Sequence, residues 1–598
     1  MPYKRLPSSP VQADILSKLS QAPHTRSPLP PQRTHKRPRI DAPSIKEGAI
    51  SRASLDDTVR PGDDFYGYVN NQWLSFHDIP ADRSSWGFGG LLQETSIAQV
   101  RAILTELGEH EGELGHQEQL LATFFKTAMD QTTLDSAGIM PLVEMISAIE
   151  AATSEEAIST LLGEFHASGI HPFFGISVDA DAKNSGFNIA CLFQGGLGLP
   201  EREYYLEEGA RPAEIRHKYV THITDMLTIS DLSFDIPMSK VATDIMAVET
   251  LLASLSMTKE DGQDPEKCYN KRTSAELKTL APNIKWEAYF KGLGISTPEA
   301  FDIQSPAFFA GLSATLHLLP LETVKNYLVW NALNAMAPHL STDISNQDFD
   351  FYSQELSGKT ERAPRWKEVV SSLSPSLDEV LGQLYVQRHF PSSSKEKMAE
   401  LVDYLGHSLK AKIRELPWMD ASTKEKALKK ADAFAVKIGY PDIWTSVDDL
   451  SFEPGKHAHN ILAMQQYEVA LEMAKVGQPI DSNEWEMSPQ TVNAYFHPTR
   501  NEIVFPAAIL QSPFFDPDAD AAQNFGGIGA TIGHEMSHSF DDSGRKYDWE
   551  GNLTDWWTPE SADAFEKLAD RLAAQFDAFE INGLHVNGRY TLGENIAD

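Results

Sequence analysis

Cysteine is scarce in this sequence: two residues, Cys191 and Cys268, occur among 598. Two cysteines allow one disulfide at most, and their wide separation forms no CxxC metal-binding pattern. The sequence therefore lacks the disulfide framework of a small secreted scaffold, and it favours a reducing, cytoplasmic compartment.

Long apolar runs are also missing. No segment reaches the roughly 18 consecutive apolar residues that a membrane-spanning helix needs. The first residues, MPYKRLP, lack the apolar region of a signal peptide. We therefore expect a soluble protein with no membrane segment.

Positive charge is in short supply, because 51 Lys and Arg face 85 Asp and Glu, a net charge of −34. A surface of this sign repels phosphates, so nucleic acid is not an expected partner. Residues 1–48 are the exception, since this stretch is basic and rich in proline. It holds too little apolar surface to offset the entropy of ordering, which predicts a disordered tail. Its segment 33–39 (RTHKRPR) fits either a basic address signal or a solvated tail.

The rest of the chain is predicted to be mainly α-helical, with enough apolar residues (41%) for a large core. Up to about residue 480, long helical patterns alternate with short Pro/Gly breaks; in 395–416, for example, apolar residues recur at spacings of three and four. Another helix is expected to begin at Lys424, with Thr423 as its cap. Strand-like patterns are concentrated in 186–193 and 491–505.

The segment 533–538 (GHEMSH) contains the HExxH pattern, formed by His534, Glu535 and His538. Residues four apart lie on one face of a helix, so both imidazoles can bind one Zn²⁺. Glu535 can then take a proton from metal-bound water as the general base. The pattern also arises by chance, and a single helical His is more often an ordinary core or surface residue. Glycines at 526, 527 and 529 lower helix propensity, which indicates close packing there.

A zinc site needs a third protein ligand, and the candidate is Glu594 in the segment 593–598 (GENIAD). Asp598 lies four residues later on the same helix face and can accept a proton from a ligand imidazole, while Asp541 is placed to do the same for the other histidine. Thr558 and Pro559 are expected to open a further helix between these elements. For either Asp alone, the alternative is an ordinary surface carboxylate.

Two strand-like segments, 491–496 and 502–505, precede this pattern and flank the turn 497–501. An exposed edge strand can bind an extended peptide, and Asn493 can add a side-chain hydrogen bond to the peptide backbone. An ordinary structural hairpin explains the pattern equally well.

With these motifs in view, the chain resembles the neprilysin and endothelin-converting enzyme family of zinc metallopeptidases (gluzincins), in particular its soluble bacterial-type members. The resemblance covers about residues 60–598. It rests on the segments PGDDF (61–65), GLPEREYY (198–205), KIGYP (437–441), VNAY (492–495), HEMSHSFDD (534–542), WW (556–557) and ENIAD (594–598).

This resemblance implies a mainly α fold of two helical lobes enclosing a central chamber. The large lobe would be 49–480, with some of its N-terminal segments packing on a zinc-binding lobe, 481–598, that carries a small β-hairpin beside the HExxH helix. Asn493 and Ala494 would hold the peptide backbone, and Ile509 and Phe514 would line an apolar pocket. The expected protein is a monomeric zinc metalloendopeptidase with one Zn²⁺ per chain. It would cleave small to medium peptides on the amino side of large hydrophobic residues.

The sequence departs from the family in two ways that bear on function. The family's C-terminal part supplies a His that stabilises the oxyanion and an Arg that grips substrate. The sequence stops at Asp598, so it resembles a C-terminally truncated member of reduced activity. Where some animal members carry arginines that bind a free substrate carboxylate, this chain has Ser85 and Gln93, which predicts weak exopeptidase behaviour. The competing hypotheses are a peptide-binding protein without turnover and a zinc exopeptidase.

Overall fold

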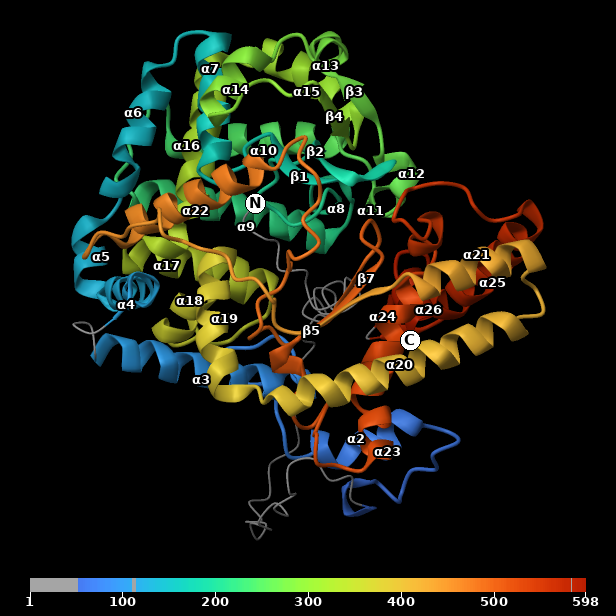
Figure 1. The fold of residues 1–598 in the computed structure, drawn as a ribbon. Helices are drawn as coiled ribbons and strands as arrows, with labels where there is room; N and C mark the ends of the chain where they lie inside the picture. The colour runs from blue at the N-terminus through green and yellow to red at the C-terminus, as the bar shows by residue number, and fades with distance from the viewer. Residues whose placement is uncertain (1–51, 110–113, 582) are drawn as a thin grey trace.

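The computed structural model describes residues 52–109, 114–581 and 583–598. The predicted basic tail, 1–48, lies outside these ranges. Helices account for 58% of the described residues and strands for 9%, arranged in two lobes with small sheets (Figure 1). The predicted fold class, mainly α in two lobes, is confirmed.

The larger lobe occupies the upper left of Figure 1 and consists of helices around one mixed sheet. Its helices are α5 (Gln131–Ala137), α6 (Val143–Ala151), α7 (Glu155–Ala167), α8 (Glu203–Leu206), α9 (Ala210–Ile229), α10 (Met238–Leu255), α11 (Lys259–Gly262), α12 (Pro265–Cys268), α13 (Ser274–Leu280), α14 (Trp286–Leu293), α15 (Pro306–Leu318), α16 (Leu321–Met336), α17 (Thr342–Asp348), the π-helix η5 (Phe349–Leu356) and α22 (His457–Ala474). Its strands are β1 (Phe174–Asp181), β2 (Asn184–Gln194), β3 (Lys271–Thr273) and β4 (Ala300–Ile303), in the order β1-β2-β4-β3. β2 runs antiparallel to β1 and parallel to β4.

Below the larger lobe, a layer of mutually packed helices leads toward the smaller lobe (Figure 1). It consists of α3 (Phe88–Glu109), α4 (His116–Met129), α18 (Arg365–Ser371) and α19 (Pro375–His389).

The smaller lobe surrounds α24 (Ile528–His538), at the right and bottom of Figure 1. Its other elements are α2 (Phe65–Leu74), α20 (Ser392–Glu415), α21 (Ala421–Asp432), β5 (Ala435–Gly439), β6 (Tyr495–His497), β7 (Glu502–Pro506), α23 (Ala521–Gly526), α25 (Pro559–Asp577), β8 (Glu580–Ile581), β9 (Leu584–His585) and α26 (Leu592–Ala597). The chain leaves this lobe after β5, forms α22 in the larger lobe and returns at β6. Elements from before residue 480 therefore flank α24. The division of the chain into two lobes at residues 480/481 stays a prediction.

The sheet of the smaller lobe has the order β5-β7-β6. The central strand β7 is buried along its whole length, as expected for a strand covered on both faces. β6 pairs with it antiparallel, with Phe496 opposite Ile503, and forms one end of the sheet. The predicted strand 491–496 is therefore partly wrong, because β6 begins only at Tyr495 and Asn493 and Ala494 precede it.

Helix starts follow the capping residues. Thr558 caps α25 as predicted, accepting a hydrogen bond from the Ser561 amide at 3.3 Å, with a proline in the first turn. The prediction for Thr423 is wrong: α21 begins at Ala421, and the Asp420 carboxylate accepts from the amides of Ser422 and Thr423. Asp420 stands one position before the helix and is as good a cap as threonine, so the helix starts earlier.

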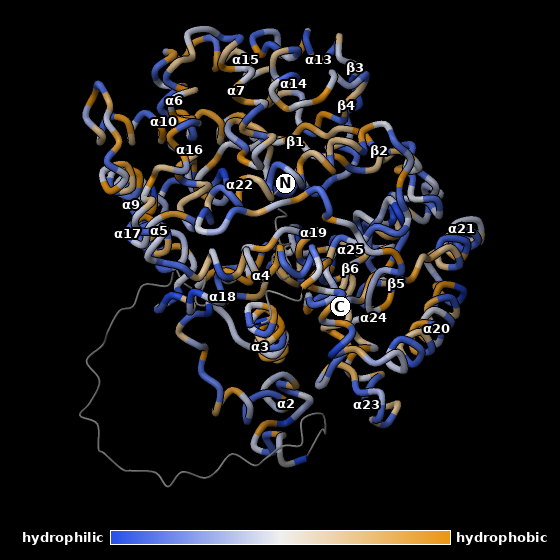
Figure 2. Tube along the Cα trace, turned by 60° about the vertical axis from the view of Figure 1, so that its left-hand side comes forward, coloured by the Kyte–Doolittle hydropathy of each residue, from blue (hydrophilic) through white to orange (hydrophobic). Residues whose placement is uncertain are grey.

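Apolar residues are spread over many helices rather than gathered in one continuous apolar helix (Figure 2). A large core runs through both lobes, and a second core fills the space between α20, α21 and α25, with Trp556, Trp557 and Phe565 at its centre. Within the described ranges, no single helix is long and apolar enough to cross a membrane. α15 and the run Leu321–His339 meet that test only together, and they bend by 119° at their junction.

Candidate active site

The helix α24 presents the two histidines of the HExxH pattern on one face. The Nε2 atoms of His534 and His538 lie 3.0 Å apart, with the two rings perpendicular. The opposite face, with Ile528, Ile532 and Met536, is buried in the core. The helix begins at Ile528, because Gly527 interrupts the helical conformation between α23 and α24. A Cβ at Gly527 would lie 2.4 Å from the Phe514 carbonyl oxygen, so the close packing indicated by the glycines is present here.

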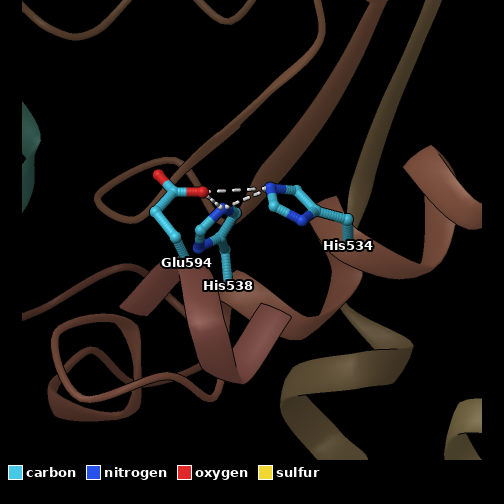
Figure 3. Close-up of side chains that lie close together, drawn as sticks. All are labelled: His534, His538 and Glu594. Carbon is cyan, nitrogen blue, oxygen red and sulfur yellow. Dashed lines mark hydrogen bonds and ion pairs between the residues drawn. The ribbon is translucent and has the colours of Figure 1, made fainter. Parts of the chain in front are cut away.

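Glu594, on the short helix α26, points into the space between the two imidazoles (Figure 3). Its Oε2 lies 3.3 Å from His534 Nε2 and 3.7 Å from His538 Nε2. α26 packs against both α24 and α25, which brings this carboxylate from sixty residues away in sequence to the HExxH face. The structure thus brings together the three predicted metal ligands, with ligand atoms all within 4.8 Å of one another.

These three groups fit a tetrahedral metal. With metal–ligand bonds of about 2.0–2.1 Å, ligand atoms in a tetrahedral zinc site lie about 3.3 Å apart, and the observed separations range from 3.0 to 3.7 Å. Each His Nδ1 contacts a carboxylate, which only accepts, so each Nδ1 carries a proton, and each Nε2 presents a lone pair once its own proton is released. Two lone pairs and a carboxylate oxygen therefore face one another, an arrangement that a cation stabilises.

His538 is supported from the loop that follows α24. Its Nδ1 lies 2.8 Å from Asp541 Oδ2, and the other oxygen of Asp541 accepts from the backbone amides of Ser543 (2.9 Å) and Gly544 (2.6 Å). The Asp541 side chain is 9% exposed. Burial lowers the pKa of His538, but the hydrogen bond and charge of Asp541 outweigh it, so this pKa is raised overall.

His534 is supported from α26. Its Nδ1 lies 2.8 Å from Asp598 Oδ1, in a pair whose carboxylate side chain is 81% exposed. Hydrogen bonds to Asp598 and Glu594 raise the pKa of His534 to about 10, and the bond to His534 lowers the pKa of Asp598. The structure therefore places both predicted supporting carboxylates against the two histidines.

Glu535 lies on the inner side of α24 and is 6% exposed. Burial raises the pKa of its carboxyl to about 7, against the opposing influence of His538, His534 and the backbone amide of Phe496 in β6. A carboxyl whose pKa lies near neutrality can both accept and return a proton.

The predicted substrate-binding residues lie around this helix at different depths. Asn493 is partly buried and Ala494 buried, both just before β6, which packs against α24. Ile509 ends the short helix η6 (Ala507–Ile509) and is 5% exposed, and the Phe514 carbonyl accepts from the Ile528 amide at the start of α24. Ile509 and Phe514 both belong to the apolar packing that includes Ile528 and Ile532.

Ser85 and Gln93 stand where some animal members carry carboxylate-binding arginines. Ser85 lies just before α3, and Gln93 lies near the beginning of that helix. Ser85 is exposed, and Gln93 accepts a 3.4 Å contact from Arg83, whose guanidinium also pairs with Glu94. Arg83 is a cation beside this position that the sequence analysis did not consider.

One further charged residue near the site was also missed. Lys430, on α21, has no exposed surface and donates to backbone carbonyls of the loop that carries Asp541. The one sign of this role in the sequence is position, because Lys430 falls on the same side of α21 as the apolar residues Ala427 and Ala431.

Known proteins match most of the chain. The family model described as Peptidase family M13 matches residues 61–441 and 493–598. The chain is 31% identical to endothelin-converting enzyme 1 of Bos taurus over 572 residues, which covers 91% of this chain and 74% of that protein.

Two solved structures of one relative differ in their overall similarity to this chain. The zinc metalloprotease Zmp1 of Mycobacterium tuberculosis in complex with inhibitor is similar with a TM-score of 0.88 at 35% identity, covering 92% of this chain and 84% of that chain. The same protein in its open state is similar with a TM-score of 0.73 at 35% identity, covering 90% and 84%. The structure described here is thus more similar overall to the inhibitor complex than to the open state. On these matches the chain belongs to Peptidase family M13, as its resemblance to neprilysin and endothelin-converting enzyme implied, and it is a peptidase of that family.

Proposed function

We propose that this chain is a zinc-dependent metalloendopeptidase in which His534, His538 and Glu594 hold one Zn²⁺ and Glu535 is the general base. The observation that carries the proposal is the convergence of three ligand atoms at zinc-like separations beside a buried carboxyl of raised pKa. Family membership supports it, because the relatives include an enzyme described as a zinc metalloprotease.

Each residue of the proposed site has a separate role in the reaction. Zinc, when bound, lowers the pKa of a coordinated water and polarises the scissile carbonyl. Asp541 and Asp598 hold the Nδ1 protons, which keeps both Nε2 lone pairs directed at the ligand position. Glu535 takes a proton from the attacking water and delivers it to the leaving amine, which its near-neutral pKa favours.

We further propose that the substrate is an extended peptide of small to medium size. β6 is the end strand of its sheet and lies against α24, so its outer edge suits strand addition by a peptide. Asn493 and Ala494, just before β6, would hold the peptide backbone, and Ile509 and Phe514 would select a large hydrophobic residue after the cleaved bond. Because a methylene in such a pocket is worth only about 1–3 kcal/mol, the preference is expected to be broad.

The experiment compares Glu535→Gln with His534→Ala, using metal content and peptide cleavage as separate readouts. Glu535→Gln is expected to keep one zinc per chain and to lose kcat by about a thousandfold or more, since general base catalysis and proton return both disappear. His534→Ala is expected to lose the zinc as well. Glu560→Gln, at an exposed position on α25, is the matched control. A folded wild-type chain without zinc, or a Glu535→Gln variant that keeps most of its kcat, would contradict the assignment.

The substrate proposal is tested by Asn493→Ala against the control Asn483→Ala, an exposed asparagine outside the hairpin. Asn493→Ala is expected to lower kcat/KM for several peptides while zinc content stays unchanged. Equal kcat/KM values for the two variants would contradict a role for Asn493 in holding substrate.

A further inference from the structure

Lys430 is a fully buried lysine whose three hydrogen bonds all go to backbone carbonyls. Its side chain has no exposed surface, and Nζ donates to the oxygens of Ser539 (2.8 Å), Gly544 (2.7 Å) and Tyr547 (2.7 Å). An ammonium has three N–H donors and a neutral amine has two, so the ammonium form satisfies all three carbonyls. Burying an ammonium costs free energy unless hydrogen bonds or opposite charges compensate it, and here three backbone carbonyls do so.

The three carbonyls belong to one segment, the loop 539–547, which follows the HExxH helix. Ser539 is the residue directly after His538 and ends α24. Gly544 and Tyr547 lie at the other end of the loop. The ammonium therefore ties the start of the loop to its end, and the loop wraps around it.

A continuous path of hydrogen bonds leads from Lys430 to the metal site. Lys430 holds the carbonyl of Gly544, and the amide of the same residue donates to Asp541 Oδ1 at 2.6 Å. The other carboxylate oxygen of Asp541 lies 2.8 Å from His538 Nδ1. Gly544 cannot change freely, because a Cβ there would lie 1.9 Å from the His538 carbonyl oxygen.

Lys430 is itself fixed by the hairpin on the substrate side. The Asn501 side chain donates to the Lys430 carbonyl at 3.1 Å, and the rings of Phe496 and Phe540 lie 5.9 and 5.7 Å from Nζ. Burial lowers the pKa of Lys430 to about 7, while the charges of Asp541 and Asp548 act to raise it. The lysine thus joins α21, the hairpin and the loop 539–547 at one point.

We propose that Lys430 is a positioning residue for the metal site. Its ammonium holds the loop 539–547 in the shape that presents Asp541 to His538, and through Asp541 it keeps His538 Nε2 directed at the metal. The inference rests on the proposed zinc site and adds a residue that touches neither metal nor substrate.

The test is a double-mutant cycle read out as the zinc dissociation constant, measured by chelator competition on the full chain. Lys430→Met is expected to weaken zinc binding by about tenfold or more, the usual cost of losing a partner of a ligand. If Lys430 acts through Asp541, then Lys430→Met in an Asp541→Asn background should add little, whereas with Asp598→Asn the two effects should multiply. Excess zinc should restore most of the kcat of Lys430→Met, which a merely structural defect would not allow.

The matched control is Lys426→Met, because Lys426 lies one turn earlier on α21 and donates to a single carbonyl, that of Trp556, outside the loop. It is expected to leave the zinc dissociation constant within about twofold of wild type. If Lys430→Met does not accumulate as folded protein, Lys430→Gln, which keeps an amide donor, carries the same measurement. An unchanged zinc affinity in the Lys430 variant, or effects that multiply with Asp541→Asn, would overturn the inference. Absence of zinc binding in the wild type would instead overturn the proposed function.

Discussion

The two histidines of the metal site have carboxylate partners at the same distance but in different surroundings. Asp541 and Asp598 each lie 2.8 Å from an Nδ1 atom. The Asp541 side chain is 9% exposed and is fixed by two backbone amides, whereas Asp598 is the last residue of the given sequence and its side chain is 81% exposed in the chain as given. Distance alone would rank the two supports as equal.

The surroundings rank them differently. A hydrogen bond to an ionised group is stronger where water and counterions are excluded, and a partner already fixed by other bonds loses little entropy on pairing. Asp541 has both advantages, and the loop that carries it is held by Lys430. We therefore expect His538 to be the rigidly oriented ligand and His534 the more adjustable one.

The largest expected effect is that of pH on both ligands together. Hydrogen bonds to carboxylates raise the pKa of His534 to about 10, and Asp541 raises that of His538, so in the metal-free chain both imidazoles keep a second proton to higher pH than a free histidine does. Zinc needs the same Nε2 atoms, so binding releases these protons, and affinity falls as pH falls. Below the pKa of both groups the slope is expected to approach two, about a hundredfold in affinity per pH unit.

Calorimetry in two buffers of different ionisation enthalpy measures the released protons directly. At neutral pH a value of about one or more is expected, because the pKa of His534 is raised to about 10, and a value near zero would mean that both imidazoles are already neutral without metal.

The second-largest expected effect distinguishes the two carboxylate partners, Asp541 and Asp598. Asp541→Asn is expected to weaken zinc binding by about 10- to 100-fold, because a ligand histidine loses a buried carboxylate partner. The measurement is chelator competition, with circular dichroism to check that the fold is retained. An effect no larger than that of Asp598→Asn would remove the distinction between the buried and the exposed partner.

The sequence predicted that His534, His538 and Glu594 come together, because spacing and residue type carry that information. Four-residue spacing on a helix puts His534 and His538 on one face, and a carboxylate with a second Asp four residues later fits a support helix. The cap at Thr558 was likewise predictable, since it depends on neighbours in sequence.

Other features depend on packing between distant segments. The turn in which Asp541 accepts from the amides of Ser543 and Gly544 is local, but the loop that contains this turn is held by Lys430, a residue from a distant segment. Lys430 is likewise buried by a loop more than a hundred residues away in sequence. β6 starts late because its pairing with β7 sets its length, and alternation in the sequence does not show where pairing begins.

The third effect is that of the exposed partner. Asp598→Asn is expected to weaken zinc binding by about 1.4- to fivefold, the range that an exposed ion pair of about 0.2–1 kcal/mol allows. The control is Asp563→Asn. This residue lies on α25 and makes no ion pair or hydrogen bond described for this part of the chain. A loss above about tenfold would place Asp598 on a level with Asp541.

The smallest effect is that of salt, and it tests the cause of the difference. Raising NaCl from about 0.05 to 0.5 M shortens the Debye length from more than 10 Å to below 5 Å, which screens exposed charges and leaves buried pairs nearly untouched. The net charge of −34 attracts a divalent cation, so salt is expected to weaken zinc binding in every variant. This general effect cancels when each variant is compared with wild type at the same salt concentration. The affinity ratio of wild type to Asp598→Asn should then fall toward one as salt rises, because screening removes most of what the exposed carboxylate contributes. The corresponding ratio for Asp541→Asn should stay constant, since its partner is shielded from ions by the loop 539–547. If both ratios fell in parallel, the two carboxylates would act through the same solvent-exposed field, and burial would not explain the difference between them.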